Sequence, residues 1–397
     1  MKVALIFDVK IRYPPDYNNM KCYYVTRELC SRGIKVTWLS ISDRHRSYEV
    51  DGIKFVELQI PKLRFIWTLL SAFRVATYCR KEGISVVYAD DWLFMRKRIL
   101  SKLSFQFVIR LFRIFWTSDM RDPWLDFEVA IGNTSEGSIY YLVKRVEELL
   151  FFFFSSLIIL PSEAYASFMI RQGIESKKVF GIFRGIDRLL FTPYTDGRKL
   201  RERLRISDVF VLGWFGIMHR YRLIDDVLIP LANNLEKVFP DAYLLIGGKG
   251  PMQESINKLN SGTAKKRVIY VGTIPYENMP EYIAACDLLL CPVSTKSRFS
   301  LFSAWLKIAE ALAVGKPVVA TRTFTSTIDF KQLRGVVWVG STYEEFIEGI
   351  KLAMRNLPRL REEAMNQAAD FRLYSIDRNI SKIVDAILNI ANSRRNS

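Results

Sequence analysis

Short apolar runs alternate with amphipathic stretches along the first half of the chain. The strand-like runs are Lys2–Phe7, Lys35–Leu39, Lys54–Leu58, Ser85–Tyr88, Arg113–Thr117, Ser156–Leu160 and Val179–Phe183. Helical patterns lie between them, the clearest being Tyr23–Ser31, Phe65–Arg80 and Ser138–Leu150. Strands that alternate with helices form parallel sheets, because parallel neighbours need a long crossover connection. The first half therefore predicts a doubly wound α/β domain.

The alternation pauses at Phe191–Arg198, which contains Pro193 and Gly197, and then begins again. The later strand-like runs are Val209–Trp214, Ala242–Ile246, Arg267–Val271, Leu288–Cys291, Pro317–Thr321 and Val336–Val339. The later helical patterns are Ile224–Val238, Met279–Ala285, Ala304–Val314 and Tyr343–Arg355, and residues 375–395 form one long amphipathic helix. We therefore predict two Rossmann-like, doubly wound domains, residues 1–193 and 194–374, followed by a helical tail, residues 375–397. Ligands of such sheets bind at the carboxyl ends of the strands, here in a cleft between the domains.

Composition supports this organisation and narrows the partners. A length of 397 residues suits two domains, and the 50% hydrophobic share excludes large-scale disorder. The formal net charge of +17 favours anionic ligands or surfaces. Five cysteines without CxxC spacing predict neither disulfides nor a zinc site, and hence a reducing, cytoplasmic compartment. We expect no secretory signal, because Met1–Asp8 has the pattern of a strand. The apolar run Leu149–Leu160 is too short to span a bilayer and predicts a helix end followed by a buried strand.

The segment Val209–Leu228 carries the first candidate site. A strand ends in Gly213-Trp-Phe-Gly216, a basic loop follows, and a helix begins near Leu223. Glycine allows close approach of a ligand to the backbone, and a helix N-terminus favours an anion. Arg220 and Arg222 can add charge-assisted bonds to a phosphate. The alternative is an ordinary βα turn whose arginines are solvated.

The segment Leu244–Pro251 is a second strand that runs into a glycine cluster. It contains Lys249, whose flexible ammonium can reach a phosphate. The alternative is a tight βα turn with a surface lysine.

The segment Leu306–Thr321 places Lys307 and Glu310 three residues apart, on one face of a predicted helix. Gly315 ends that helix, and a buried strand begins at Pro317. A carboxylate in such a place can accept hydrogen bonds from both hydroxyls of a ribose. The alternative is an ion pair on the helix surface.

These motifs resemble, in order, those of the retaining glycosyltransferases of family 4, also called group 1. Glu310 to Ala320 matches the ending E-A-x-A-x-G-x-P-V-V-A of that family. Further similar stretches are Arg184–Asp187 with Phe191 and Pro193, Val271-Gly272 with Met279–Asp287 and Pro292, Gly216 with Arg222 and Asp225, and Asp119–Trp124. The resemblance extends over nearly the whole chain.

The resemblance implies a GT-B fold, with acceptor binding in the first domain, donor binding in the second and a C-terminal helix that returns to the first. It implies transfer, with retention, from a nucleotide-diphosphate sugar to a lipid-linked or polysaccharide acceptor. The implied donor-binding residues are Gly216, Arg220, Arg222, Gly248, Lys249, Ile274, Lys307 and Glu310. The candidate catalytic residues are Arg222, Asp119 and Asp122. No D-x-D motif is present, so we expect no metal and no cofactor, with cations such as Arg222 and Lys249 stabilising the leaving diphosphate.

The chain departs from the family pattern at several positions. Ile217 stands where the family has an arginine, and Phe302 where it has the first of two glutamates. Arg184 replaces the asparagine of N-G-V-D, and Asp119 occupies the place of a histidine that many relatives carry near the donor sugar. Two alternatives therefore stay open: a nucleotide-sugar epimerase or phosphorylase of the same fold, and a non-catalytic module that binds an anionic ligand or a membrane.

Residues 92–118 contain no acidic residue and alternate basic with large apolar side chains. Basic amphipathic segments of this kind are typical of proteins that bind membrane surfaces. Arg96, Lys97, Arg98 and Lys102 are the predicted docking residues, and they imply peripheral binding to the inner face of the cell membrane. One alternative is a core helix with a solvated basic rim. Another is a nucleic-acid site, which is less favoured because no nucleic-acid-binding motif accompanies the basic residues.

Overall fold

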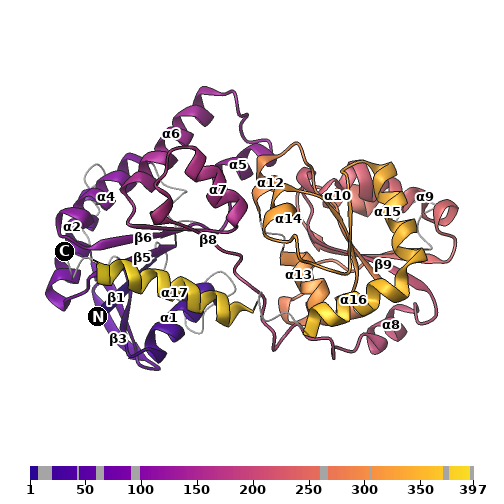
Figure 1. Cartoon of the computed structure of the whole chain (residues 1–397), viewed down its shortest axis with the longest axis horizontal. Helices are drawn as coiled ribbons and strands as arrows, with labels where there is room; N and C mark the ends of the chain where they lie inside the picture. The colour runs from indigo at the N-terminus through magenta and orange to yellow at the C-terminus, as the bar shows by residue number, and fades with distance from the viewer. Residues whose placement is uncertain are drawn as a thin grey trace. The chain divides into compact units, whose positions relative to one another are not determined.

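The computed structural model describes residues 1–7, 20–42, 44–59, 67–90, 99–259, 267–303, 306–369 and 375–393. The chain divides into two compact units, each built around one sheet. The first unit comprises Met1–Leu125, Thr134–Phe183 and Asp377–Ser397, and the second comprises Asp126–Asn133 and Arg184–Ile376. Both sheets have helices on their faces (Figure 1). The prediction of two Rossmann-like domains is therefore confirmed.

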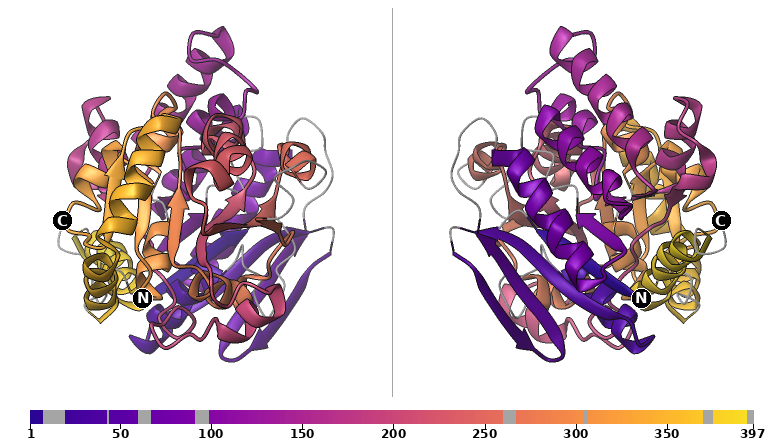
Figure 2. Two further views of the ribbon diagram at one scale, coloured as in Figure 1. Left: turned by 90° about the vertical axis from the view of Figure 1, so that its right-hand side faces the viewer. Right: turned by 90° about the vertical axis from the view of Figure 1, so that its left-hand side faces the viewer.

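Among the described residues, the sheet of the first unit has eight strands in the order β3-β4-β2-β1-β5-β6-β7-β8. Its strands are β1 (Lys2–Phe7), β2 (Lys35–Ser42), β3 (Arg46–Val50), β4 (Ile53–Gln59), β5 (Val86–Asp90), β6 (Phe115–Asp119), β7 (Leu157–Leu160) and β8 (Val179–Gly181). All neighbouring strands are parallel except β3 and β4, which form the hairpin seen in indigo in Figure 2. The turn of this hairpin is Asp51-Gly52, where both residues have positive φ. Such a turn matches the twist of paired strands, which explains the tight connection.

The helices of the first unit are α1 (Met20–Ser31), α2 (Trp67–Glu82), α4 (Ile99–Leu111), α6 (Ile139–Phe154), α7 (Glu163–Arg171), η1 (Ser176–Lys178) and α17 (Ile376–Ser393). The apolar run Leu149–Leu160 ends α6 and continues into the fully buried β7, as predicted. Within the described ranges, no helix is both long and apolar enough to cross a membrane. The predicted return of the C-terminal helix is also confirmed, because Arg32 forms an ion pair with Asp385 and Asn379 donates a hydrogen bond to the Phe183 carbonyl oxygen.

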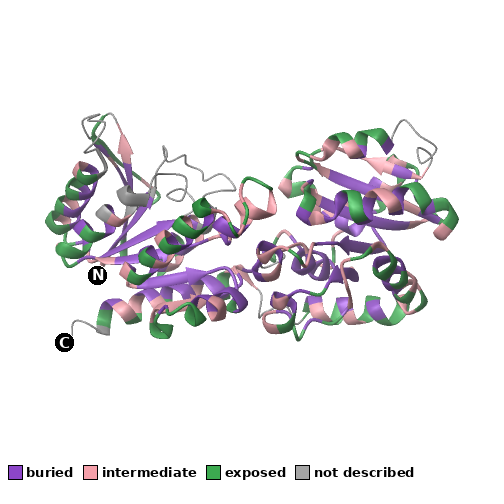
Figure 3. Cartoon of the chain, turned by 90° about the horizontal axis from the view of Figure 1, so that it is seen from above, coloured by how far each residue is buried: buried purple, intermediate pink, exposed green. Residues whose placement is uncertain are grey.

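In the part of the second unit that the structure describes, the sheet has six parallel strands in the order β11-β10-β9-β12-β13-β14. They are β9 (Phe210–Ile217), β10 (Ala242–Lys249), β11 (Val268–Tyr270), β12 (Leu288–Cys291), β13 (Val318–Thr321) and β14 (Val336–Val339). The helices are α8 (Arg198–Leu204), η2 (Arg220–Arg222), η3 (Ile224–Leu228), α9 (Ile229–Val238), α10 (Gln253–Leu259), η5 (Tyr276–Asn278), α11 (Met279–Ala284), α12 (Arg298–Phe302), α13 (Leu306–Ala313), α14 (Phe324–Ile328), α15 (Tyr343–Arg355) and α16 (Leu357–Ala369). The strands of both sheets are largely buried, whereas the helices expose their outer faces (Figure 3).

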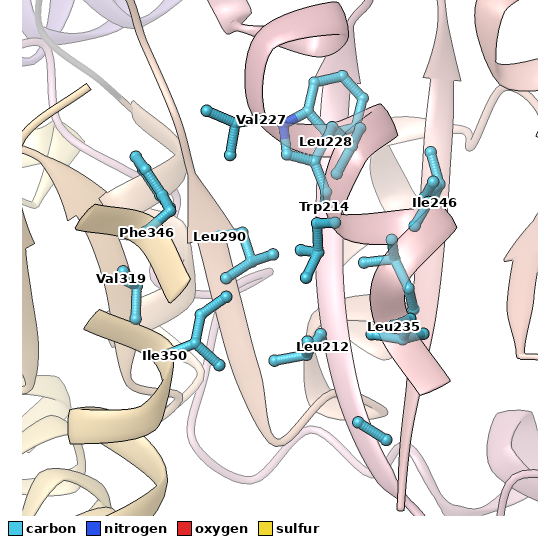
Figure 4. Close-up of a cluster of buried hydrophobic side chains, with 14 of the residues drawn as sticks. Leu212, Trp214, Val227, Leu228, Leu235, Ile246, Leu290, Val319, Phe346 and Ile350 are labelled. Carbon is cyan, nitrogen blue, oxygen red and sulfur yellow. The ribbon is translucent and has the colours of Figure 1, made fainter. Parts of the chain in front are cut away.

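One face of this second sheet packs against η3, α9 and α15. Figure 4 shows the meeting of strand residues Leu212, Trp214, Ile246, Leu290 and Val319 with helix residues Val227, Leu228, Leu235, Phe346 and Ile350. Burying one such side chain contributes about 1.5–3 kcal/mol, so this cluster stabilises the second sheet. A capping box between Thr342 and Glu345 sets the start of α15.

The unit boundaries differ from the predicted ones at residues 193 and 374. The second unit begins at Arg184 because Ile186 forms a bridge with Ser375 of the same unit. It also includes Asp126–Asn133, most of helix α5 (Trp124–Ala130), since Phe127 packs edge-on against Tyr221 and Phe299. Both differences from the predicted boundaries arise from contacts between segments that are far apart in the sequence.

Candidate functional site

The carboxyl ends of β9 and β10 lie side by side, with Gly216 opposite Gly248. Gly248 has a φ of +136°, and a Cβ there would lie 1.8 Å from the Gly216 carbonyl oxygen, so only glycine permits this approach. The Gly248 amide donates to the Gly272 carbonyl oxygen at 2.7 Å, and the Tyr270 hydroxyl donates to the Gly248 carbonyl oxygen at 2.8 Å. These bonds hold the end of β10 against the end of β11 at one edge of the sheet.

Lys307, in the first turn of α13, lies against Gly216. A Cβ at Gly216 would be 3.0 Å from Lys307 Cε and 3.7 Å from Lys307 Nζ. The ammonium therefore lies at the carboxyl end of β9. Burial lowers the pKa of Lys307, the charge of Glu310 opposes this decrease, and the charge of Arg222 adds to it.

Glu310 lies one turn further along α13 and is only 4% exposed. Burial raises the pKa of this carboxyl, while the charge of Lys307, a hydrogen bond from Tyr276 and the charge of Arg222 all oppose the increase. The alternative of an ion pair on the helix surface is wrong, because the side chain faces the interior. An interior carboxylate keeps its charge only where such partners surround it.

Arg222 ends the short helix η2, which follows β9. Leu223 comes next in the left-handed conformation, with a φ of +51°, and its amide donates to the Arg220 carbonyl oxygen at 2.9 Å. This tight turn directs the chain into η3. Arg222 is half-buried, its Cζ lies 5.5 Å from the centroid of the Tyr221 ring, and its charge acts on both Lys307 and Glu310.

A cavity of the second unit opens onto this group of charges. It is lined by Phe215, Met279, Ile283, Leu289, Leu290, Cys291, Lys307, Glu310 and Val318. With Arg222 close by, two cations oppose one carboxylate in mainly apolar surroundings. A net positive charge in a medium of low polarity attracts an anion, and the carboxylate can accept hydrogen bonds from hydroxyl groups. This combination suits a phosphorylated ligand that also carries hydroxyls.

The other predicted donor residues differ in their surroundings. Ile274 is buried against Gly247, where a Cβ would lie 2.4 Å from Ile274 Cδ1, so this stretch of β10 is closely covered. Arg220 and Lys249 are exposed near the same edge of the sheet. The structure thus brings together Gly216, Gly248, Lys307, Glu310 and Arg222, and leaves Arg220 and Lys249 at the surface.

A ring cluster adjoins Arg222. The His219 ring stacks on Tyr221 with centroids 5.5 Å apart, and Phe127 meets His219 edge-on at 6.1 Å. Burial lowers the pKa of His219, and the charge of Arg222 lowers it further. Phe302, which stands where the family has its first glutamate, is buried and packs edge-on against Phe324. That position therefore belongs to the core of the second unit.

In the first unit, Asp119 ends β6 and is buried. The Tyr88 hydroxyl donates a hydrogen bond to its Oδ2. Arg121 pairs with Asp90 at the end of the neighbouring β5, a partner that the sequence analysis did not predict. Burial, followed by the charge of Asp119, raises the pKa of Tyr88 well above its ordinary value, so its hydroxyl stays a donor. Asp122 is half-buried just before α5.

The predicted docking residues Arg96, Lys97 and Arg98 lie outside the described residues. Lys102 lies on α4, but its side chain is likewise outside the description. Among the residues that the structure covers, no group of three or more His, Cys, Asp or Glu side chains is arranged to hold a metal ion.

Residues 209–329 match the model of the family described as glycosyl transferases group 1. This is the family that the motifs predicted, and its match covers the cavity and its charges. A GDP-mannose-dependent alpha-(1-6)-phosphatidylinositol monomannoside mannosyltransferase of Mycolicibacterium smegmatis is 31% identical over 147 residues, 35% of this chain and 37% of that protein. Sulfoquinovosyl transferase SQD2 of Arabidopsis thaliana is 24% identical over 174 residues, 42% of this chain and 31% of that protein. The chain thus spans about a third of the length of these curated relatives.

Solved structures resemble the whole chain. Sucrose-phosphate synthase from Thermosynechococcus elongatus superimposes with a TM-score of 0.71 at 16% identity, covering 98% of this chain and 99% of that one. Anabaena HepE in complex with UDP gives 0.70 at 18% identity, covering 98% and 100%. At these identities the likeness shows the fold.

Proposed function

We propose that this chain, whose residues 209–329 match the model of the group 1 glycosyl transferases, transfers a sugar from a nucleotide-diphosphate sugar to an acceptor. The observation that carries the proposal is the cavity at the carboxyl edge of the second sheet, where Lys307 and Arg222 oppose the buried Glu310. A nucleotide sugar offers the matching chemistry, because its diphosphate is anionic and its ribose carries two adjacent hydroxyls. The glycine pair lets the ends of β9 and β10 approach closely and leaves room for Lys307 at the end of β9.

In the proposed reaction, Glu310 accepts hydrogen bonds from the ribose, while Arg222 and Lys307 neutralise charge on the diphosphate. The bond between the anomeric carbon and the phosphate oxygen breaks, and a bond to the acceptor oxygen forms on the same face of the sugar. The acceptor proton passes to the departing phosphate, so the protein needs no separate base. Fixed cations that stabilise the leaving group are worth more in a cavity than in water. With two cations in place, we propose that the reaction needs no metal ion.

We propose a lipid-linked or polysaccharide acceptor and peripheral binding to the inner face of the cell membrane. The Mycolicibacterium smegmatis relative is named for a phosphatidylinositol monomannoside, which is a lipid. The net charge of +17 favours an anionic membrane. Asp119 and Asp122 in the first unit are the proposed residues for binding the acceptor or the donor sugar.

A second candidate is a non-catalytic module that binds an anionic ligand. Phe302 favours it, because a buried phenylalanine stands where the family has a glutamate. Incubation with uridine, guanosine and adenosine diphosphate sugars, with nucleotide release as the readout, separates the two candidates. We expect release with at least one donor, and a melting temperature that rises with the matching nucleoside diphosphate. Stabilisation without release from any donor would favour the binding module, and the absence of both would overturn the proposal.

A further inference from the structure

Helix α6 buries a charged pair and exposes a stripe of apolar side chains. Arg145 and Glu148 are buried and form an ion pair with each other. Arg145 Nη2 also donates to the Tyr141 hydroxyl at 2.7 Å, and the Tyr165 hydroxyl donates to Glu148 Oε1 at 3.3 Å. The inner face of α6 therefore combines a hydrogen-bonded polar network with the buried Phe151 and Phe152.

The outer face of α6 is apolar over its whole length. The side chains between 41% and 82% exposed on this helix are Ile139, Tyr140, Leu142, Val143, Val146, Leu150 and Phe153. Most recur every three or four residues, which places them on one stripe. A surface helix in water normally has the opposite arrangement, so the outer stripe calls for an apolar partner.

Helices α4 and α2 extend this apolar surface. The three helices lie next to one another in the first unit, in the order α2, α4, α6 (Figures 1 and 2). Phe107 and Leu111 of α4 are 57% and 59% exposed, and Leu69 and Phe73 of α2 are also exposed. We name this set of exposed apolar side chains on α2, α4 and α6 the α6 face.

The exposed charged side chains that the structure describes on α2, α4 and α6 are all basic. Arg74, Arg80 and Lys81 of α2 and Arg110 of α4 are exposed. The described acidic side chains of these helices, Glu82, Glu147 and Glu148, are half-buried or buried. A second copy bound symmetrically would set these cations against themselves, because the same patch meets itself across a two-fold axis. An anionic surface with an apolar interior fits both the charge and the stripe.

We propose that the α6 face docks the chain on a bilayer that contains anionic lipid. The apolar side chains enter the acyl boundary, and the cations pair with the headgroups, which is how basic amphipathic helices bind interfaces. The inference rests on the proposed function, in which the acceptor is a lipid. It assigns the membrane contact to helices α2, α4 and α6, in addition to the predicted docking segment Arg96–Arg98. Insertion rather than charge alone holds the chain on the membrane.

The test uses the full chain and sedimentation with vesicles of phosphatidylcholine, with and without phosphatidylglycerol. The variant is Leu142→Ser with Leu150→Ser, and the matched control is Leu189→Ser with Leu352→Ser, which removes two exposed leucines from the second unit. Because all four side chains are exposed, the melting temperature should stay unchanged. We expect the parent and the control to bind anionic vesicles alike, and the variant to bind roughly tenfold more weakly or worse, since two inserted leucines are lost.

Equal binding of the variant and the parent would overturn the proposal. So would a concentration-dependent dimer, seen by light scattering, that the variant loses, because a second copy would then occupy the α6 face. Nucleoside diphosphate stabilisation, measured on the same proteins without vesicles, tests the donor cavity independently. If nucleoside diphosphates stabilised neither the parent, the variant nor the control, the proposed function would be contradicted. Vesicle binding would still decide the role of the α6 face.

Discussion

Replacing Glu310 with glutamine removes one negative charge from a side chain that is 4% exposed while keeping its shape. If the ribose hydroxyls donate to this carboxylate, the variant loses the ionic part of those bonds. Hydrogen bonds to charged groups contribute about 1.5–3 kcal/mol, which corresponds to a factor of roughly 10 to 150. We therefore expect kcat/KM for the donor to fall by that factor.

The same change leaves Lys307 and Arg222 without their nearby carboxylate. Breaking a buried ion pair costs up to about 3–5 kcal/mol, but Lys307 can limit the cost by releasing its proton. A domain of this size loses about 2–4 °C in Tm per kcal/mol. Because burial lowers the pKa of Lys307 in the folded state, the unfolded state binds more protons, and stability rises with pH. The Tm deficit of Glu310→Gln should therefore shrink as the pH rises from about 7 towards about 10.

The assay is the initial rate of nucleotide release against donor concentration, with Tm measured on the same samples. Glu277→Gln is the matched control, since Glu277 is exposed, lies next to Tyr276 and undergoes the same chemical change. It should keep the parental kcat/KM and Tm. A Glu310→Gln protein that keeps the parental kcat/KM but melts lower would refute the ribose role and leave the carboxylate as a counter-ion for Lys307.

Arg222→Ala should lower kcat by roughly 10²–10³, the scale for removing one preorganised transition-state donor, whereas a change confined to KM would show ground-state binding only. A chelator such as EDTA should leave the rate unchanged, and a loss that added magnesium or manganese restores would contradict the proposal that the two cations suffice. Because burial raises the pKa of Glu310, the acid limb of kcat/KM should lie above the ordinary glutamate value of about 4.3 and should disappear in Glu310→Gln; a limb that persists would assign it to another group.

Local patterns predicted the elements well, because burial repeats with the period of each element. The runs Lys2–Phe7, Leu288–Cys291 and Val336–Val339 coincide with β1, β12 and β14. The hairpin partner β3 was missed because its side chains are mostly exposed, so it carries no apolar pattern. The turn Asp51-Gly52 is the signal that could have revealed it.

The candidate site likewise has features that the local sequence predicts and features that it does not. Lys307 and Glu310 were predictable as a pair on one helix, since their spacing is local. Their burial, and the approach of Lys307 to Gly216, depend on residues about 90 positions away in the sequence and have no local signature. The pairing of Asp90 with Arg121 is a long-range outcome of the same kind.

Gly216 and Gly248 stand opposite each other in one register, yet alanine should affect them differently. At Gly248 the new Cβ would lie 1.8 Å from a backbone oxygen, at a φ of +136°, so the paired strand ends must separate. Strain of this kind costs about 1–3 kcal/mol before the clash is counted, and Tm should fall by several degrees. At Gly216 the Cβ would meet the far end of the flexible Lys307 at 3.0 Å, so the lysine moves and the fold stays intact. Gly216→Ala should therefore keep the parental Tm and lower kcat/KM roughly tenfold, as expected when a binding cation is displaced. Parental kinetics in Gly216→Ala, with Gly248→Ala destabilised as expected, would show that the position of the Lys307 ammonium at the end of β9 does not matter for donor use.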